Sequence, residues 1–236
     1  MKLALVDDYV PALVEGESVR RLAGDLPEIM ALPPFYRMAG LIEHWGELRA
    51  RVASSKAPRL SLDEVALRAP VPRPTKLLCG QLSFKEGVAE ASVKPAFFLK
   101  SSTSVIGPGD TVELPSVDAP VFHHEAELAL VIGKRAKNIS AATALDHVFG
   151  YTCFLDMSAR AVGHGTSFQD KSYDTFGPMG PWILTADAAP DPHDLNVRLW
   201  VDDELRQDYP MADIGNPIGD MIAYASSIAA LEPGDV

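Results

Sequence analysis

Two glutamates stand two residues apart at the start of an apolar run. This spacing allows their two carboxylates to act together. Glu125 and Glu127 open a stretch typical of a β-strand, so alternation along the strand places both carboxylates on one face. His123 joins that face if the strand begins early enough. The opposite face, directed at a core, carries Leu128, Leu130 and Ile132. Neighbouring carboxylates in apolar surroundings repel unless a cation lies between them, and Mg²⁺, Mn²⁺ and Ca²⁺ prefer carboxylate oxygens. The pair predicts a divalent-metal site; the alternative is two solvated side chains on an edge strand.

A third acid stands at the end of a second apolar run. Residues 148–155 are typical of a buried strand, and Asp156 follows them directly, with Arg160 a turn further on. An acid at the end of a buried strand is well placed to become a metal ligand. The alternative is that Asp156 ends the strand and pairs with Arg160.

A lysine lies in a loop rich in glycine and proline. Residues 170–182 form an irregular connection before another strand, and Lys171 stands near its start. From such a loop an ammonium group can reach an anionic substrate or an enolate oxygen. The alternative is an ordinary surface lysine.

Composition narrows the class of protein. The chain has 236 residues and a formal net charge of −11, so its surface repels phosphate backbones and nucleic acid is not expected as a partner. No apolar run is long enough to cross a bilayer, so no membrane partner is expected. The two cysteines, Cys79 and Cys153, make neither a disulfide framework nor a zinc pattern. They are expected to be buried, reduced thiols in a soluble, cytoplasmic protein.

The elements that position these residues fall into two parts. Alternating runs between residues 2 and 22 predict a small β-meander, and the apolar spacing of residues 35–55 predicts an amphipathic helix. Pro70, Pro72 and Pro74 form a stiff connector, so a small N-terminal module over residues 1–70 and a main domain over residues 71–236 are expected.

The sequence of the main domain predicts mostly β-strands. The expected strands are 76–80, 96–100, 111–114, 121–132, 148–155, 181–185 and 195–201. One late helix is expected, with Asn216 as its cap, Pro217 at its first position and an apolar stripe that runs to Ile228. The class is therefore α+β, dominated by β-structure.

Taken together, the three chemical segments resemble the fumarylacetoacetate hydrolase superfamily. That family's pattern is H-x-E-x-E before an apolar strand, then L-D-x-S-A-R, then K-S-x-D-T-F-x-P-x-G-P-W. The same patterns stand here at residues 123–127, 155–160 and 171–182, with supporting matches at 98–100, 106–110, 205–207 and 231–236. The resemblance covers about residues 76–236, in the right order and spacing.

The resemblance implies a β-rich roll of mixed sheets with a small N-terminal module, usually assembled as a homodimer. It implies a metal, Mg²⁺ or Mn²⁺ with Ca²⁺ possible, held by Glu125, Glu127 and Asp156. It gives catalytic roles to Lys171 and His123. It also implies that the small oxo acid substrate contacts Arg160, Lys100 and Asp174.

The sequence departs from the family pattern in three places. Hydrolytic members activate water with a histidine and a glutamate after the linker; here Glu86 stands about where the histidine belongs and Glu90 about where the acid belongs. His164 is an alternative base from the loop after Arg160, and Gly163 replaces a glutamine that many members carry. The family also continues with T-G-T-P-x-G after the last match, so the sequence is expected to lack the C-terminal strands.

Three functions remain open on these residues. The first is a metal-dependent hydrolase that cleaves a C–C bond in a diketo acid or acylpyruvate through a stabilised enolate. The second is a decarboxylase, isomerase, lyase or dehydratase of a 2-oxo acid on the same site, which the missing histidine favours somewhat. The third is a non-catalytic protein in which the carboxylates hold a structural cation.

Overall fold

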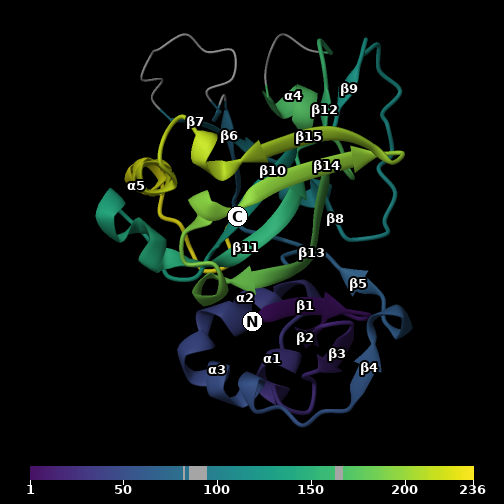
Figure 1. Ribbon diagram of the computed structural model, residues 1–236, viewed down its shortest axis with the longest axis vertical. Helices are drawn as coiled ribbons and strands as arrows, with labels where there is room; N and C mark the ends of the chain where they lie inside the picture. The colour runs from purple at the N-terminus through teal and green to yellow at the C-terminus, as the bar shows by residue number, and fades with distance from the viewer. Residues whose placement is uncertain (82, 85–94, 163–166) are drawn as a thin grey trace.

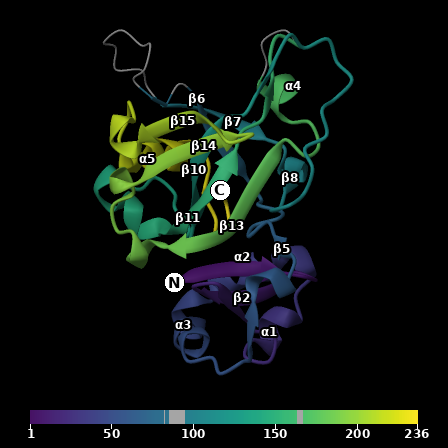
Figure 2. The ribbon, with the colours of Figure 1, turned by 45° about the vertical axis from the view of Figure 1, so that its right-hand side comes forward.

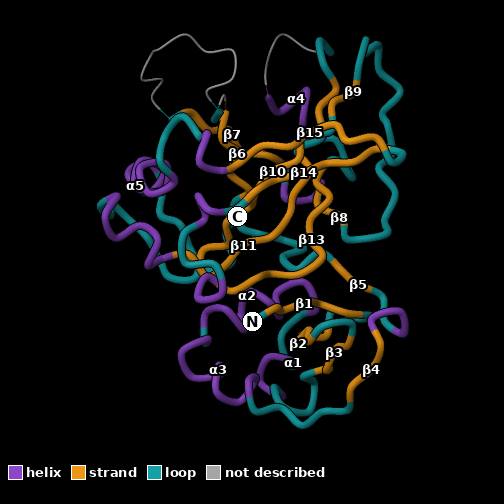
Figure 3. The backbone as a smooth tube through the Cα atoms, viewed as in Figure 1, coloured by secondary structure: helices purple, strands orange, loops and turns teal. Residues whose placement is uncertain are grey.

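A single large sheet runs through most of the molecule, which is seen here as a computed structural model (Figure 1). The structure describes residues 1–81, 83–84, 95–162 and 167–236. Strands outnumber helices throughout, so the predicted class, α+β with β dominant, is confirmed (Figure 3).

In the described part of the chain the large sheet has nine strands, and its main path runs β10-β11-β13-β1-β2-β3-β4. Two short strands lie off this path, with β5 paired to β1 and β8 paired to β13. All the pairs are antiparallel except β8 with β13. The strands are β1 (Lys2–Val6), β2 (Val10–Glu15), β3 (Ser18–Arg21), β4 (Arg59–Ser61), β5 (Leu67–Arg68), β8 (Val105–Ile106), β10 (Ala126–Ile132), β11 (Val148–Leu155) and β13 (Gly177–Thr185).

Three two-stranded pairs surround the upper part of this sheet, and all three are antiparallel (Figure 2). They are β6 (Leu77–Gln81) with β7 (Ala96–Lys100), β9 (Phe122–His123) with β12 (Ser158–Ala159), and β14 (Asn196–Val201) with β15 (Glu204–Pro210).

The helices are short. The α-helices are α1 (Pro27–Met30), α2 (Arg37–Glu43), α3 (Trp45–Ala53), α4 (Ser167–Lys171) and α5 (Ile218–Ile228). Of these, α2 and α3 pack against the large sheet, because Leu41 and Val52 share a hydrophobic cluster with Leu3. The 3₁₀ turns are η1 (Pro34–Tyr36), η2 (Leu62–Glu64), η3 (Ser102–Ser104), η4 (Ala141–His147), η5 (Ala186–Ala188), η6 (Pro192–Asp194) and η7 (Met211–Asp213). Among the residues described, no helix has the length and apolar character needed to cross a membrane.

The N-terminal predictions are largely confirmed. β1, β2 and β3 form the expected meander, with Leu3 opposite Leu13 and Val14 opposite Val19. The helix expected over residues 35–55 is two helices, because His44 has φ −99° and ψ 17° and interrupts the helical run between α2 and α3.

The strand expected over residues 111–114 is absent, and the prediction was wrong. The backbone there bonds to side chains instead of to a neighbouring strand: Glu113 N–H donates to Thr175 Oγ1 at 2.8 Å. Just before it, the Asp110 carboxylate accepts from Gly107 N–H at 2.8 Å and closes a turn that includes Gly109 at φ +81°.

Two further boundaries differ from the prediction. The strand expected over residues 121–132 is broken at residues 124–125, because β9 pairs with β12 whereas β10 pairs with β11. The late helix begins at Ile218, and its N-cap is Pro217 in an extended conformation (φ −53°, ψ 141°), so Asn216 is not the cap.

The expected small module shares the large sheet with the rest of the chain. β1 pairs with β13, with Leu3 opposite Ile183, and one hydrophobic cluster contains Leu3 and Leu41 together with Val131 and Phe149. The connecting prolines are themselves buried. The two regions therefore have a common core, and a domain boundary near residue 70 remains a prediction.

Candidate metal centre

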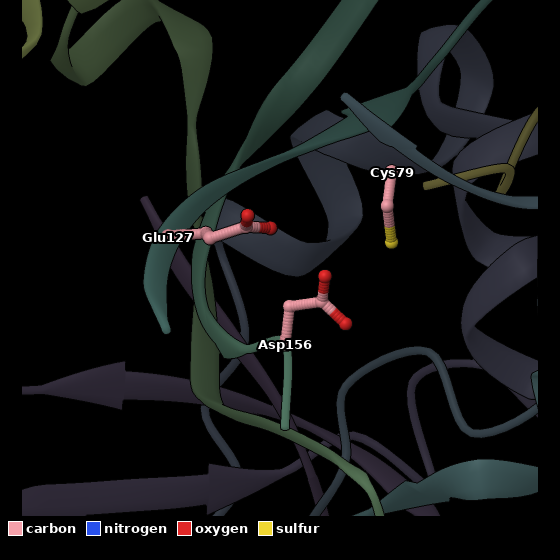
Figure 4. A group of neighbouring side chains, drawn as sticks. All are labelled: Cys79, Glu127 and Asp156. Carbon is pink, nitrogen blue, oxygen red and sulfur yellow. The ribbon is translucent and has the colours of Figure 1, made fainter. Parts of the chain in front are cut away.

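Antiparallel pairing of β10 with β11 brings the predicted acids together. Ala126 lies opposite Leu155, so the residues that flank this pair meet, and Asp156 N–H donates to Glu125 C=O at 2.8 Å. One oxygen of Glu127 and one of Asp156 lie within 4.8 Å of each other. Figure 4 shows both carboxylates pointing into the same space. Two of the three predicted ligands, Glu127 and Asp156, therefore meet across neighbouring strands, and the backbone of Glu125 lies beside Asp156.

The ammonium group of Lys171 lies between two of these acids. It is the last residue of α4, and its Nζ donates to Glu125 Oε2 and to Asp156 Oδ2, each at 2.5 Å. Burial alone lowers the pKa of Lys171, but the charges and hydrogen bonds of Asp156 and Glu125 outweigh it and raise the pKa above its ordinary value. The surface-lysine alternative is thus excluded, because Lys171 is buried within the cluster.

Lys100 lies behind Asp156, with a side chain that is 0% exposed. Its Nζ donates to Asp156 Oδ1 at 2.8 Å, to Met157 C=O at 3.2 Å and to Lys171 C=O. An ammonium has three donors, so these three acceptors use all of them. Burial lowers the pKa of Lys100, and the charge of Asp156 opposes that effect. In this arrangement Lys100 holds the ends of β11 and α4 together and has no donor left for a substrate.

Arg160 pairs with Glu125, and the alternative pairing with Asp156 is not formed. Its Nη2 donates to Glu125 Oε1, and its Nε lies 3.0 Å from His123 Nδ1. The pairing of β9 with β12 makes this possible, because it sets Ser158 opposite His123. The Arg160 side chain is 41% exposed, so part of the guanidinium faces open space beside the acids.

Of the three acids, Glu127 receives the least compensation from the neighbouring positive charges. The hydrogen bonds of Lys100, Lys171 and Arg160 described above go to the other two acids. Burial, and then the negative charge of Asp156, raise the pKa of Glu127 to about 8. The carboxyl group therefore keeps its proton at neutral pH until another cation arrives. Three carboxylates, one of them uncompensated, suit a hard divalent cation.

Cys79 also belongs to this cluster, which sequence reasoning missed. It lies on β6, is 4% exposed, and its Sγ lies within 4.8 Å of the ligand oxygens of Glu127 and Asp156 (Figure 4). Burial raises the pKa of its thiol well above the ordinary value. The apolar run 76–80 indicated a buried cysteine, which is confirmed, but no local signal shows that β6 faces the start of β10.

Cys153 differs from the prediction, because its thiol is free but exposed. It lies on β11, along a groove that β14 borders through Val197 and Leu199. The neighbours of Cys153 along the strand, Thr152 and Phe154, point the other way and are buried.

Of the remaining predicted site residues, Asp174 is described and is not brought into the cluster. Asp174 is exposed in the turn after α4, and within the described residues no hydrogen bond or ion pair joins it to the three acids. Glu86, Glu90 and His164 lie outside the described residues. The prediction that one of them serves as the base stays untested.

The sheet roll and its acidic centre define the class. The family model for the fumarylacetoacetate (FAA) hydrolase C-terminal region matches residues 76–236, so the chain belongs to the fumarylacetoacetate hydrolase superfamily. The crystal structure of maleylpyruvate hydrolase from Sphingobium sp. SYK-6, in complex with manganese(II) and pyruvate, has 37% sequence identity and a TM-score of 0.90. That similarity covers 100% of this chain and 86% of that one.

Two curated relatives carry different activities in their names. Maleylpyruvate hydrolase of Aquipseudomonas alcaligenes is 32% identical over 259 residues, covering 100% of this chain and 88% of that protein. The mitochondrial oxaloacetate tautomerase fahd2 of Xenopus laevis is 37% identical over 185 residues. That alignment covers 75% of this chain and spans 58% of the tautomerase's length.

Proposed function

We propose that the protein is a divalent-metal-dependent hydrolase that cleaves a C–C bond in an acylpyruvate or related diketo acid. The observation that carries this is an acidic cluster in which Glu127 and Asp156 lie within 4.8 Å of each other and Lys171 donates to both Asp156 and Glu125. The similarity to maleylpyruvate hydrolase, whose crystal structure holds manganese(II) and pyruvate, supports the same assignment.

In this proposal Glu125, Glu127 and Asp156 hold Mg²⁺ or Mn²⁺, with Ca²⁺ as a further candidate. When bound, such an ion supplies a Lewis acid for the negative charge that develops on the 2-oxo group. The donor set fits, because all three groups are carboxylates and, in the described part of the chain, the lysine and arginine side chains bond to Glu125 and Asp156 and not to Glu127.

The cations around the acids have separate roles in this proposal. Arg160, which is partly exposed beside Glu125, binds the substrate carboxylate, because a guanidinium matches a carboxylate with two parallel hydrogen bonds. Lys171 adds positive charge next to the developing enolate. His123 accepts a hydrogen bond from Arg160 and orients it, and in this proposal it also carries a proton during the reaction. Lys100 is a positioning residue, since its three donors are bound within the protein.

In the same proposal, Glu86 and Glu90 activate the attacking water molecule. A glutamate works as a general base when its surroundings raise its pKa. Both residues lie outside the described part of the chain, so their roles rest on their positions in the sequence.

A second candidate is isomerisation of a 2-oxo acid, such as the keto–enol conversion of oxaloacetate. The similarity to an oxaloacetate tautomerase favours it, at 37% identity over 185 residues. Tautomerisation needs the same acids and a proton carrier but no attacking water. The site therefore supports either reaction, and the base decides between them.

Product analysis of the Mn²⁺-loaded protein tests this proposal. We expect acylpyruvates such as maleylpyruvate to yield pyruvate and a second carboxylic acid, with oxaloacetate as the parallel substrate. Glu127→Gln should abolish turnover, and Glu17→Gln, at an exposed position in the turn between β2 and β3, is the matched control. Interconversion of oxaloacetate tautomers without C–C cleavage selects the second candidate, and evolution of CO₂ selects decarboxylation. Metal binding without turnover of any oxo acid refutes both enzymatic proposals.

We also propose that the protein forms a homodimer through the β14–β15 hairpin. Trp200 lies opposite Leu205 across this hairpin, and the two are 55% and 48% exposed. Large exposed apolar side chains that adjoin one another are typical of a surface that a partner covers. Light scattering should give a dimer mass for the wild type and a monomer mass for Trp200→Glu.

A cytoplasmic location is also part of the proposal, because both cysteine thiols are free and disulfides are rare in the cytoplasm. Cell fractionation tests this location.

A further inference from the structure

A buried thiol lies beside two of these acids, Glu127 and Asp156. Cys79 comes from β6, whereas Glu127 comes from β10 and Asp156 follows β11. One ligand atom from each lies within 4.8 Å of the other two, and Figure 4 shows the sulfur directed toward the Asp156 carboxylate. Within the described residues, no hydrogen bond to the Cys79 sulfur is present, although the side chain is 96% enclosed by protein.

This arrangement differs in donor chemistry from the three-carboxylate centre. Hard ions such as Mg²⁺ and Mn²⁺ take oxygen ligands, while Zn²⁺ and Cd²⁺ accept thiolate sulfur readily. Zn²⁺ forms bonds of about 2.3 Å to sulfur and about 2.0–2.2 Å to carboxylate oxygen, so its ligand atoms lie about 3.5 Å apart. Three atoms within 4.8 Å of one another reach that spacing by side-chain rotation of about an ångström.

We propose that Cys79, Glu127 and Asp156 form a sulfur–oxygen site for a thiophilic divalent cation, with Zn²⁺ or Cd²⁺ as the ion. On binding, the Cys79 S–H bond and the Glu127 carboxyl O–H bond break, both protons pass to solvent, and the thiolate and the carboxylate bond to the ion. Three protein ligands leave the fourth tetrahedral position for water.

Asp156 can serve this site without losing its lysines. Lys100 and Lys171 each use one of its oxygens, and each carboxylate oxygen offers about two acceptor positions. The site shares Glu127 and Asp156 with the proposed manganese centre, so one ion excludes the other. A thiophilic ion at Cys79 would therefore compete with the hard ion.

The test uses metal-free protein and Cd²⁺, whose bond to thiolate gives a charge-transfer absorption in the ultraviolet. Cys153→Ser removes the exposed thiol and leaves Cys79 as the sole cysteine. Cys79→Ala/Cys153→Ser removes both. We expect the absorption band at one Cd²⁺ per chain in Cys153→Ser and no band in the double variant. A band that is absent from Cys153→Ser, or unchanged in the double variant, overturns the proposal.

Calorimetric measurement of metal affinity shows whether Cys79 is a metal ligand or only a packing residue. Cys79→Ala should weaken Zn²⁺ binding by about tenfold or more and change Mn²⁺ affinity by less than about threefold, because manganese does not need the sulfur. An equal loss of both affinities overturns the proposal, since it would mean that Cys79 only shapes the centre. If the alanine variant does not fold, Cys79→Ser is measured in its place. These readouts use no turnover, so they stand apart from any failure of the proposed hydrolase activity.

Discussion

Replacing Glu127 by glutamine should stabilise the metal-free protein while it destroys metal binding. Burial, and then the charge of Asp156, raise the pKa of Glu127 from 4.5 to about 8 in the folded state. An unfolded chain has no such surroundings, so folding at pH 7 forces this carboxyl group to take up a proton. Glutamine is neutral in both states and avoids that cost.

The magnitude follows from the difference between the two pKa values. A raised pKa contributes stability that is fully present below pH 4.5 and is lost as the pH rises toward 8. At about 1.4 kcal/mol for each pKa unit, the loss between pH 4.5 and 7 is at most about 3 kcal/mol. For a chain of this length each kcal/mol moves the melting temperature by about 2–4 °C, so Glu127→Gln should raise it by up to about 6–12 °C at pH 7.

The assay is calorimetric melting in chelator at pH 5, 6, 7 and 8, repeated with Mn²⁺. The difference between wild type and Glu127→Gln isolates this one carboxyl group, because every other titrating group is common to both. The difference should be small at pH 5 and grow toward pH 8. Mn²⁺ should raise the melting temperature of the wild type but not of the variant. A flat difference curve would refute the burial argument, and equal stabilisation by Mn²⁺ would remove Glu127 from the metal site.

Further predictions concern the lysine and arginine side chains beside the acids and the proton on Glu127. Lys100→Met should cost about 3–5 kcal/mol in urea unfolding, because it leaves the Asp156 carboxylate buried beside one lysine fewer; a cost below about 1 kcal/mol would contradict the buried pair. Arg160→Lys should raise KM for an acylpyruvate by about tenfold or more with a smaller change in kcat, since lysine cannot form two parallel bonds to a carboxylate; an unchanged KM would exclude Arg160 from the substrate contact. Mn²⁺ affinity should fall about tenfold for each pH unit between pH 7 and 5, because Glu127 must release a proton before it can bind the ion, and calorimetry in buffers of different ionisation enthalpy would detect that proton.

The sequence was sufficient for the local parts of this centre. Alternation along β10 correctly separated Glu127 from the core-directed Leu128 and Leu130, which pack against the cluster around Ile132. The apolar run before Asp156 correctly predicted β11. Such periodicity is a local property, so it can be read without knowing what lies across the strand.

What could not be predicted depends on contacts between distant segments. The register that sets Ala126 opposite Leu155 brings the acids together, and no local pattern shows it. Lys100 ends a strand, where a lysine is normally solvated, yet Asp156 and two carbonyl groups enclose it completely. Cys79 reaches the centre only because the fold brings its side chain on β6 near that of Glu127 on β10. In each case the residue itself could be picked out in the sequence, but the distant residue that it contacts could not.

The balance of charge explains why such a centre suits an oxo acid. Among the described residues, this centre contains three acids (Glu125, Glu127 and Asp156) and three cations (Lys100, Lys171 and Arg160), and the cations hydrogen-bond to Glu125 and Asp156. With Glu127 protonated the cluster carries one net positive charge at neutral pH. A divalent ion that displaces this proton raises the net charge to two, in a buried place where unbalanced charge is costly. An enolised 2-oxo acid brings one negative charge on its carboxylate and one on its enolate oxygen, and so restores neutrality. A neutral carbonyl compound of the same shape would leave both positive charges uncompensated, which gives a physical reason for the centre to select oxo acids.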